Sequence, residues 1–203
     1  MTTATVKVPL TPEDAARAGF YALLGSVFTR PPDAKLLQTL AIASPLEAGT
    51  VLAKPWEALV LASGVVDAEA VAEEFESLFV GVGKSKVSIY AGAYSGATPV
   101  DHPRLRITQS LAELRIERAQ GVTEPEDHLG GLFEIMRLLV AGAPGRPPES
   151  PQAQKGFFEA HLARSSTKFF DALLNDPDSN YYRRIAGLGA AFVDVEAQAF
   201  QLS

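Results

Sequence analysis

The stretch Glu124-Pro125-Glu126-Asp127-His128-Leu129 leads into the clearest apolar pattern of the chain. Apolar side chains in residues 129–141 recur at spacings of three, four and seven, which is typical of a helix with one buried face. Gly142 follows and can end the helix. This pattern predicts a buried helix, with apolar positions Leu129, Leu132, Phe133, Met136, Leu139 and Val140.

The polar residues before these positions predict the first turn of the same helix. Thr123 and Glu126 have the spacing of a capping box, and Pro125 is tolerated where its missing N–H is not needed. Two interpretations follow. The stretch only caps the helix, or Asp127 and His128 project from the helix end into a groove. A carboxylate beside an imidazole could hold a cationic or hydrogen-bonding ligand there.

Composition narrows the class of protein. The 203 residues are 47% hydrophobic and 21% charged, so the chain can bury a substantial core. The absence of cysteine excludes disulfides, thiol nucleophiles and cysteine metal sites, and is compatible with a cytosolic protein. The net charge of −6 argues against nucleic-acid binding, which needs a basic face. No apolar run is long enough for stable membrane insertion.

The rest of the chain also shows helical patterns. Thr11, Asp33 and Asp67 each precede an apolar helical run and can cap its first turn. Arg104 to Gln120 predicts a further helix that ends at Gly121. No run shows the sustained alternation of a strand. The sequence therefore predicts an all-α chain.

The predicted organisation is a flexible N-terminal arm over residues 1–10 and one all-helical domain over residues 11–203, a multi-helix bundle. A proline-rich linker at 142–151 interrupts that domain, because the four prolines and one glycine of residues 143–151 exclude regular structure there. Tyr21, in the first helix, is expected to be a partly buried aromatic residue.

Two further features of the sequence each allow more than one interpretation. Gly83-Lys84-Ser85 matches the end of a phosphate loop, so a nucleotide-hydrolysing enzyme is a competing interpretation. Leu78, however, stands where the Walker pattern needs glycine, and a helix is expected before the loop instead of a strand. The second feature is the irregular segment 86–100, with Tyr90 and Tyr94. It is either a functional ordered loop or a mobile connector.

Signals of catalysis or metal binding are weak. His102, His128 and His161 lie far apart and form no His-Glu-x-x-His pattern, and no dinucleotide fingerprint or nucleophile elbow occurs. These observations favour a binding protein over an enzyme, with no metal site and no catalytic residues.

Several segments together resemble the TorD/DmsD/NarJ family of chaperones for molybdenum-containing redox enzymes. Residues 124–129, running into Phe133–Met136, are similar to the family's Glu-Pro-x-Asp-His signature and its helix. Glu74–Gly81 is similar to the acidic and aromatic segment before the family's loop. Weaker similarity covers Tyr21–Leu24 and Phe157–Leu162. The order and spacing of these segments agree over nearly the whole chain.

The resemblance implies a TorD-like helical fold, no catalysis and no cofactor of its own. It implies a cytoplasmic assembly chaperone that binds the twin-arginine signal peptide, or the apo form, of the catalytic subunit of a molybdopterin-dependent oxidoreductase. The chaperone would hold this partner for cofactor insertion before export. A structural accessory subunit of a redox complex is a further alternative, and the oligomeric state is left between monomer and homodimer. The implied peptide-binding residues are Asp127, His128, Glu124, Tyr90, Tyr94, Phe79 and Tyr21.

The chain departs from the family in one loop. The family typically has Pro-Pro-Tyr-Glu-Ser before its second tyrosine, whereas residues 87–94 read Val-Ser-Ile-Tyr-Ala-Gly-Ala-Tyr. Both tyrosines remain, but the prolines and the acidic residue are missing. The identity of the client enzyme and the details of peptide contact are therefore left open.

Overall fold

The computed structural model describes residues 10–81, 84–96, 103–119, 121 and 123–202. In these ranges the regular secondary structure is helical, and β-structure is limited to isolated bridges. The all-α prediction is confirmed. The helices are α1 (Pro12–Thr29), α2 (Ala34–Ala41), α3 (Ala53–Ser63), α4 (Ala68–Phe75), η1 (Glu76–Val80), α5 (Gly92–Ser95), α6 (Pro103–Glu113), α7 (Leu129–Ala141), α8 (Pro151–Phe157), η3 (Phe158–Leu162), α9 (Ala163–Asn175) and α10 (Tyr181–Leu202).

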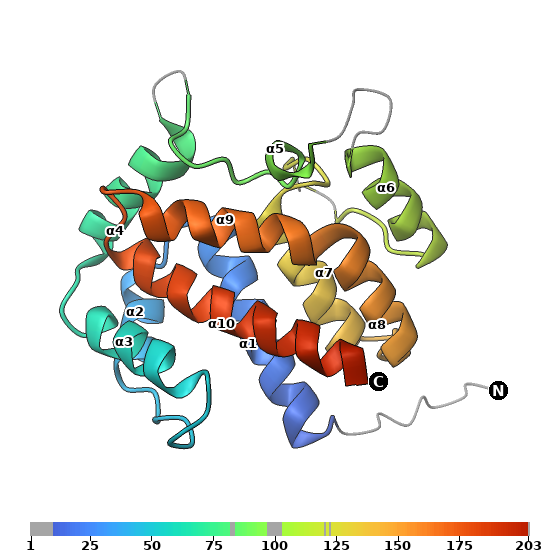
Figure 1. Cartoon of the computed structure of the whole chain (residues 1–203), viewed down its shortest axis with the longest axis horizontal. Helices are drawn as coiled ribbons and strands as arrows, with labels where there is room; N and C mark the ends of the chain where they lie inside the picture. Colours follow the sequence, from blue (N-terminus) through green and yellow to red (C-terminus); the bar gives the residue numbers. More distant parts are fainter. Residues whose placement is uncertain (1–9, 82–83, 97–102, 120, 122, 203) are drawn as a thin grey trace.

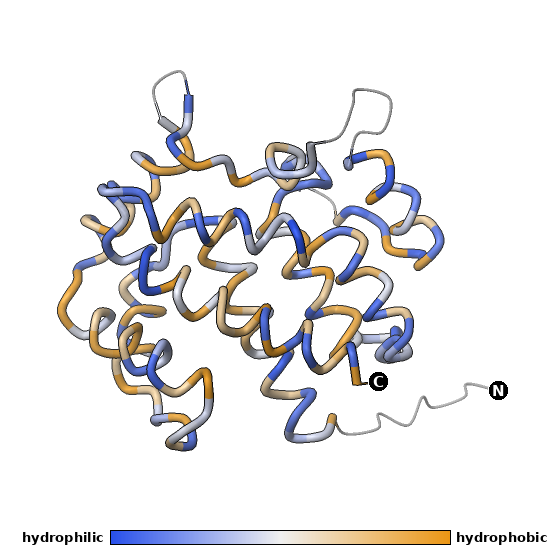
Figure 2. Tube along the Cα trace, in the orientation of Figure 1, coloured by the Kyte–Doolittle hydropathy of each residue, from blue (hydrophilic) through white to orange (hydrophobic). Residues whose placement is uncertain are grey.

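Helices α1 and α7 form the centre of the bundle, and α9 and α10 lie side by side across them (Figure 1). Glycines let α1 and α7 approach closely. A Cβ atom at Gly130 would lie 2.6 Å from Thr29 Oγ1 and 3.0 Å from the carbonyl oxygen of Gly25. The apolar face predicted for α7 is buried as expected. Along α9 and α10, hydrophobic and hydrophilic residues alternate as expected of helices with one buried face (Figure 2).

Aromatic side chains fill much of the core. Phe28 of α1 is fully buried, and five other rings surround it. The surrounding rings are Phe79, Phe133, Phe169, Phe170 and Tyr182. The Tyr182 hydroxyl donates a hydrogen bond of 2.9 Å to the carbonyl oxygen of Val27, so this buried polar atom is satisfied.

A carboxylate from α4 caps the start of α10. The two oxygens of Glu74 accept hydrogen bonds of 2.8–2.9 Å from the backbone N–H groups of Asn180, Tyr181 and Tyr182. These are donors that a helix leaves unpaired at its start, and a negative charge is favoured there. Glu74, the first of the two acidic residues in the Glu74–Gly81 segment, therefore has a structural role.

Three sequence-based expectations are corrected. Tyr21 is fully buried, not partly buried, and its hydroxyl donates a 2.8 Å hydrogen bond to Glu196 Oε2. Helix α6 ends at Glu113, well before Gln120, which lies outside the described residues. The chain turns there because Arg115 adopts a positive φ of 53°. The irregular proline-rich segment ends at residue 150, because Pro151 begins α8 with Ser150 as its cap.

The proline-rich segment is held against the body of the protein. The Arg146 guanidinium donates hydrogen bonds to the carbonyl oxygens of Leu114 and Arg115 beyond the end of α6. The backbone N–H of Glu149 donates a 2.8 Å hydrogen bond to the carbonyl oxygen of Leu139. Along the chain this segment joins α7 to α8, and its hydrogen bonds tie the residues just after α6 to α7. Of the predicted N-terminal arm, only Leu10 lies within the described residues.

Candidate functional site

The segment before α7 is a turn, and the prediction that it forms the first turn of the helix is wrong. Helix α7 begins at Leu129, and no side chain caps its N-terminus. The backbone N–H of His128 donates a 3.0 Å hydrogen bond to the carbonyl oxygen of Pro125. The backbone N–H of Thr123 donates to Glu124 Oε2, so the expected capping box does not form among these residues.

The loop that carries Tyr90 explains this difference, because it pairs with the turn through backbone hydrogen bonds. The N–H of Ala91 donates to the carbonyl oxygen of Asp127 at 2.8 Å, and the N–H of Leu129 donates to that of Ile89 at 2.9 Å. These bonds make an isolated antiparallel bridge between Tyr90 and His128. The tertiary contact replaces the local helical turn that the sequence favours.

Asp127 lies beneath the surface, contrary to the expectation that it projects into a groove. It is 1% exposed. Its Oδ1 accepts a 3.0 Å hydrogen bond from Arg104 Nε, and its Oδ2 accepts a 3.3 Å bond from the N–H of Gly92. One carboxylate thus fixes the start of α6 and the start of α5 beside α7. Asp127 therefore holds α5 and α6 beside the turn before α7.

His128 and Tyr90 lie together, with ring centroids 5.6 Å apart in an edge-to-face arrangement. His128 is 6% exposed, whereas Tyr90 is 39% exposed. Burial lowers the pKa of His128 from its ordinary value, and the nearby carboxylates of Glu124 and Asp127 oppose this change only in part. A neutral imidazole, with the exposed phenol beside it, can donate and accept hydrogen bonds.

A groove of about 820 Å³ opens between α6 and α7, and His128 and Glu124 line it. Its apolar surface comes from both helices and from the segment that joins them: Leu111, Ala112, Ile116, Ala119, Pro125, Ile135 and Leu138. Four acidic and two basic residues also line it: Glu117, Glu124, Glu126, Glu134, Arg115 and Arg118. Arg118 pairs with Glu126, and Arg137, outside the groove, pairs with Glu134. The groove is therefore apolar, with an excess of negative charge around it.

The remaining predicted residues lie elsewhere. Phe79 and Tyr21 are core residues, with 7% and 0% of their surface exposed, and neither lines the groove. Tyr94 faces a different cavity, and its hydroxyl donates a 2.6 Å hydrogen bond to the carbonyl oxygen of Ser88. Burial raises the pKa of Tyr94 to about 12. The structure thus brings together Glu124, His128 and Tyr90, with Asp127 behind them.

Sequence reasoning missed the apolar residues of the groove, although a signal for them exists. Gly131, Ile135 and Leu138 follow His128 at spacings of three and four along α7. They form a second stripe beside the buried one, and none of the three is fully buried. Two apolar stripes on one helix indicate a second surface to cover, which the search for a single buried face overlooked.

Other features predicted from sequence can be placed. A helical segment, η1, precedes Gly81, as expected, whereas Gly83 lies outside the described residues. Within the ranges the structure describes, no group of three or more His, Asp or Glu side chains could hold a metal ion. None of the described helices is both long enough and apolar enough to cross a membrane.

Comparison with known families gives one match. The family model described as the nitrate reductase delta subunit matches residues 47–171, which include η1, the Tyr90 loop, α6, α7 and most of α9. No curated protein matches the chain at a significant level. The match covers more than half of the chain and contains the whole groove apart from Thr29. The chain belongs to the nitrate reductase delta subunit family, the NarJ/TorD-type chaperones of molybdoenzyme maturation.

Proposed function

We propose that this protein is a cytoplasmic assembly chaperone that binds the twin-arginine signal peptide of a molybdoenzyme catalytic subunit in the groove between α6 and α7. It holds the apo subunit until the molybdenum cofactor is inserted, and release for export follows. The observation that carries the proposal is the combination, in one groove, of an apolar surface and an acidic surround. Family membership supplies the class of partner.

The apolar part of the groove suits the hydrophobic stretch of a signal peptide. Such a segment can lie as a helix in a groove and bury its side chains against Leu111, Ile135 and Leu138. About 25 cal/mol is gained per square ångström of apolar surface removed from water, so a short apolar helix supplies most of the affinity.

The acidic residues suit the arginine pair. Glu117, in the segment after α6, is exposed, and Glu124, whose carboxylate interacts with His128, is half-buried; both line the groove. A guanidinium forms strong charge-assisted hydrogen bonds with a carboxylate, and arginine can make two at once. The proposed contact residues are therefore Glu117, Glu124, His128 and Tyr90. Asp127 acts through its contacts with α5 and α6.

Isolation of the chain with its partner from the native host tests the proposal. The tagged protein should recover a cofactor-free molybdoenzyme subunit with its signal peptide uncleaved, and Ile135→Glu should recover less of it. Leu174→Glu is the matched control, because Leu174 is a partly exposed residue of α9 outside the groove. Recovery of the mature, cofactor-loaded enzyme in fixed stoichiometry would indicate a structural subunit instead.

A further inference from the structure

Gly131 interrupts the row of residues that α7 presents to the peptide groove. His128, Gly131, Ile135 and Leu138 line the groove and follow one another at spacings of three, four and three, so they lie on one face of the helix. At Gly131 this face carries no side chain. The wall of the groove therefore has a gap above Gly131, between His128 and Ile135, which we call the notch. Its two flanking residues are about 10 Å apart along the helix, which leaves room for one large side chain.

The fold does not require a glycine at residue 131. A Cβ atom built there meets no atom of the described residues within 4 Å, whereas at Gly130 it would lie 2.6 Å from Thr29 Oγ1. Gly131 also has a helical backbone, which residues with side chains adopt readily. Glycine is a poorer helix former than alanine, so helix stability disfavours it at this position. The space that Gly131 leaves open belongs to the groove and not to the core.

The surroundings of the notch suit an apolar side chain. His128 is 6% exposed, and burial lowers the pKa of its imidazole, so the flank on that side is an uncharged ring. Ile135 supplies an aliphatic flank on the other side, and Leu111 and Ala112 of α6 line the same groove. An apolar group that leaves water in such surroundings gains free energy in proportion to the area it buries. A large apolar side chain therefore gains more in the notch than a small one.

We propose that the notch determines specificity in the groove by receiving one bulky apolar side chain, of leucine or phenylalanine size, from the bound signal peptide. This inference rests on the proposed function, because the peptide is the occupant of the groove. Selection is by size. An alanine at the matching position of the peptide leaves the notch partly empty, and a side chain added at Gly131 competes for the same space.

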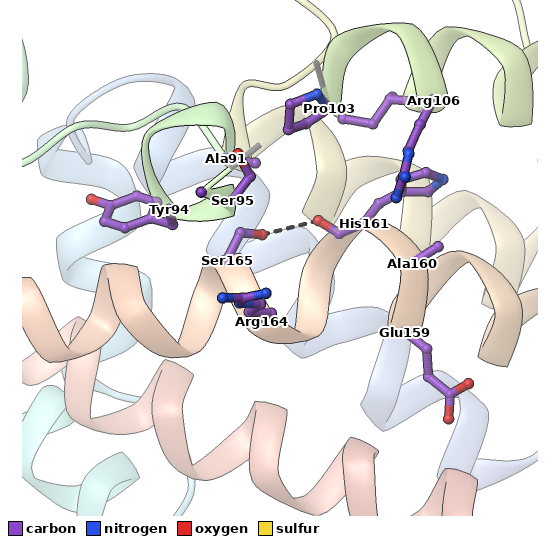
Figure 3. A pocket seen from close by; sticks show the side chains of 12 residues that line it. Ala91, Tyr94, Ser95, Pro103, Arg106, Glu159, Ala160, His161, Arg164 and Ser165 are labelled. Atoms are coloured by element: carbon purple, nitrogen blue, oxygen red, sulfur yellow. Dashed lines mark hydrogen bonds between the residues drawn. The ribbon is translucent and has the colours of Figure 1, made fainter. Parts of the chain in front are cut away.

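A second cavity supplies one control for this proposal. Its walls come from α5, from the first turns of α6 and from the η3–α9 segment (Figure 3), and among the described residues it shares no lining residue with the groove. Ala160 of η3 lines this cavity, so Ala160→Leu adds bulk outside the groove. Gly187 of α10 supplies the other control. A Cβ atom built there is as free of the described atoms as at Gly131, and Gly187 does not line the groove.

Fluorescence anisotropy tests the proposal with a synthetic peptide in which two adjacent arginines precede an apolar stretch of leucine and alanine. Gly131→Ala should bind this peptide about fivefold more weakly than wild-type protein, and Gly131→Leu about tenfold or more. Gly187→Leu and Ala160→Leu should bind it as wild-type protein does. Gly131→Ala should melt at no lower temperature than wild-type protein, so its lower affinity cannot result from unfolding.

Replacement of the peptide's leucines by alanine, one at a time, identifies the side chain that enters the notch. One replacement should weaken binding to wild-type protein about tenfold but have little further effect on Gly131→Leu. The proposal is overturned if Gly131→Leu and Gly187→Leu bind with the same affinity. It is also overturned if every replacement costs Gly131→Leu as much as it costs wild-type protein, as expected if Gly131 only lets the peptide backbone approach. If wild-type protein binds none of the peptides, the proposed function itself fails, and the notch proposal fails with it.

Discussion

The buried carboxylate of Asp127 accepts a 3.0 Å hydrogen bond from Arg104 Nε across the junction of α6 and the turn before α7. Its second oxygen accepts the N–H of Gly92, so both oxygens face donors. This arrangement links the position of α6, which forms one wall of the groove, to the signature motif. Asp127, which the motif suggests as a peptide-binding residue, is buried in this structure and contacts α5 and α6.

Asp127→Asn should therefore lower the free energy of unfolding by about 1–3 kcal/mol, because the amide nitrogen of asparagine would face one of the two donors. The Arg104 side chain is 46% exposed, so loss of the ion pair itself adds little. Asp171→Asn, at an exposed position of α9, is the control and should leave the unfolding free energy unchanged. Urea denaturation measures both. Equal urea midpoints for Asp127→Asn and Asp171→Asn would show that the contacts of Asp127 do not stabilise the folded protein.

Glu74→Ala should lower the free energy of unfolding by about 1–3 kcal/mol, because three N–H groups at the start of α10 lose their acceptor. Glu74→Gln keeps one acceptor oxygen and should have a smaller effect. Glu73→Ala changes an exposed neighbour on the same helix and should have little effect. Hydrogen exchange provides a local readout, since protection should fall first at residues 180–182. Unchanged protection there would contradict the capping role.

Gly130→Ala should destabilise the protein by about 1–3 kcal/mol through overpacking, because the new Cβ atom would lie 2.6 Å from Thr29 Oγ1. Gly131, the next residue, has no atom within 4 Å of a built Cβ position. Gly131→Ala should be neutral, or stabilising by up to about 1 kcal/mol, because alanine is the better helix former. Thermal unfolding of the two variants compares them directly. The same change in melting temperature for both would refute the close crossing of α1 and α7.

Stability should fall as the pH falls below the ordinary histidine pKa of 6.5, because the folded state lowers the pKa of both His128 and His161. Between the lowered and the ordinary pKa the unfolded chain binds more protons, so the free energy of unfolding rises with pH there. Each histidine contributes at most about 1.4 kcal/mol per pH unit. Its contribution is complete above the ordinary pKa and is lost as the pH falls through the lowered one.

Denaturation at about pH 7.5 and about pH 5.5 measures this slope. The His128→Gln and His161→Gln variants should each show a shallower slope, and the double variant a shallower one still. Carboxylates also titrate on acidification, but Glu126, whose pKa is lowered from 4.5, contributes at more acidic pH. An unchanged slope in the double variant would show that the buried histidines are not responsible.

Local signals in the sequence predicted most of the helices. The caps at Thr11, Asp33 and Asp67 form as expected, because each side chain accepts a hydrogen bond from a backbone N–H three residues ahead. The apolar stripe of α7 is likewise a property of residues close together in sequence. These interactions are local, so spacing alone reveals them.

The site was predicted less well, because it depends on contacts between distant segments. Backbone bonds from the Tyr90 loop convert the expected first helical turn into a turn with Asp127 inside. The pairing of Tyr21 with Glu196 spans 175 residues and leaves no pattern in either helix. Resemblance to the family identified the motif but could not show which of its residues reach the surface.

The most direct test of the account is a double-mutant cycle between the groove and the signal peptide. Fluorescence anisotropy at low salt would compare wild-type protein with Glu117→Gln/Glu124→Gln, using a twin-arginine peptide and the same peptide with both arginines replaced by glutamine. Glu69→Gln/Glu73→Gln on α4 removes two charges far from the groove and is the control.

We predict that the groove variant binds the twin-arginine peptide about tenfold more weakly, as expected for loss of two partly exposed ion pairs. Replacement of the arginines should weaken binding to wild-type protein but have little further effect on the groove variant, which gives a coupling free energy of about 1 kcal/mol or more. If the two protein forms lose the same affinity when the arginines are replaced, or if the α4 control behaves like the groove variant, Glu117 and Glu124 do not recognise the arginine pair.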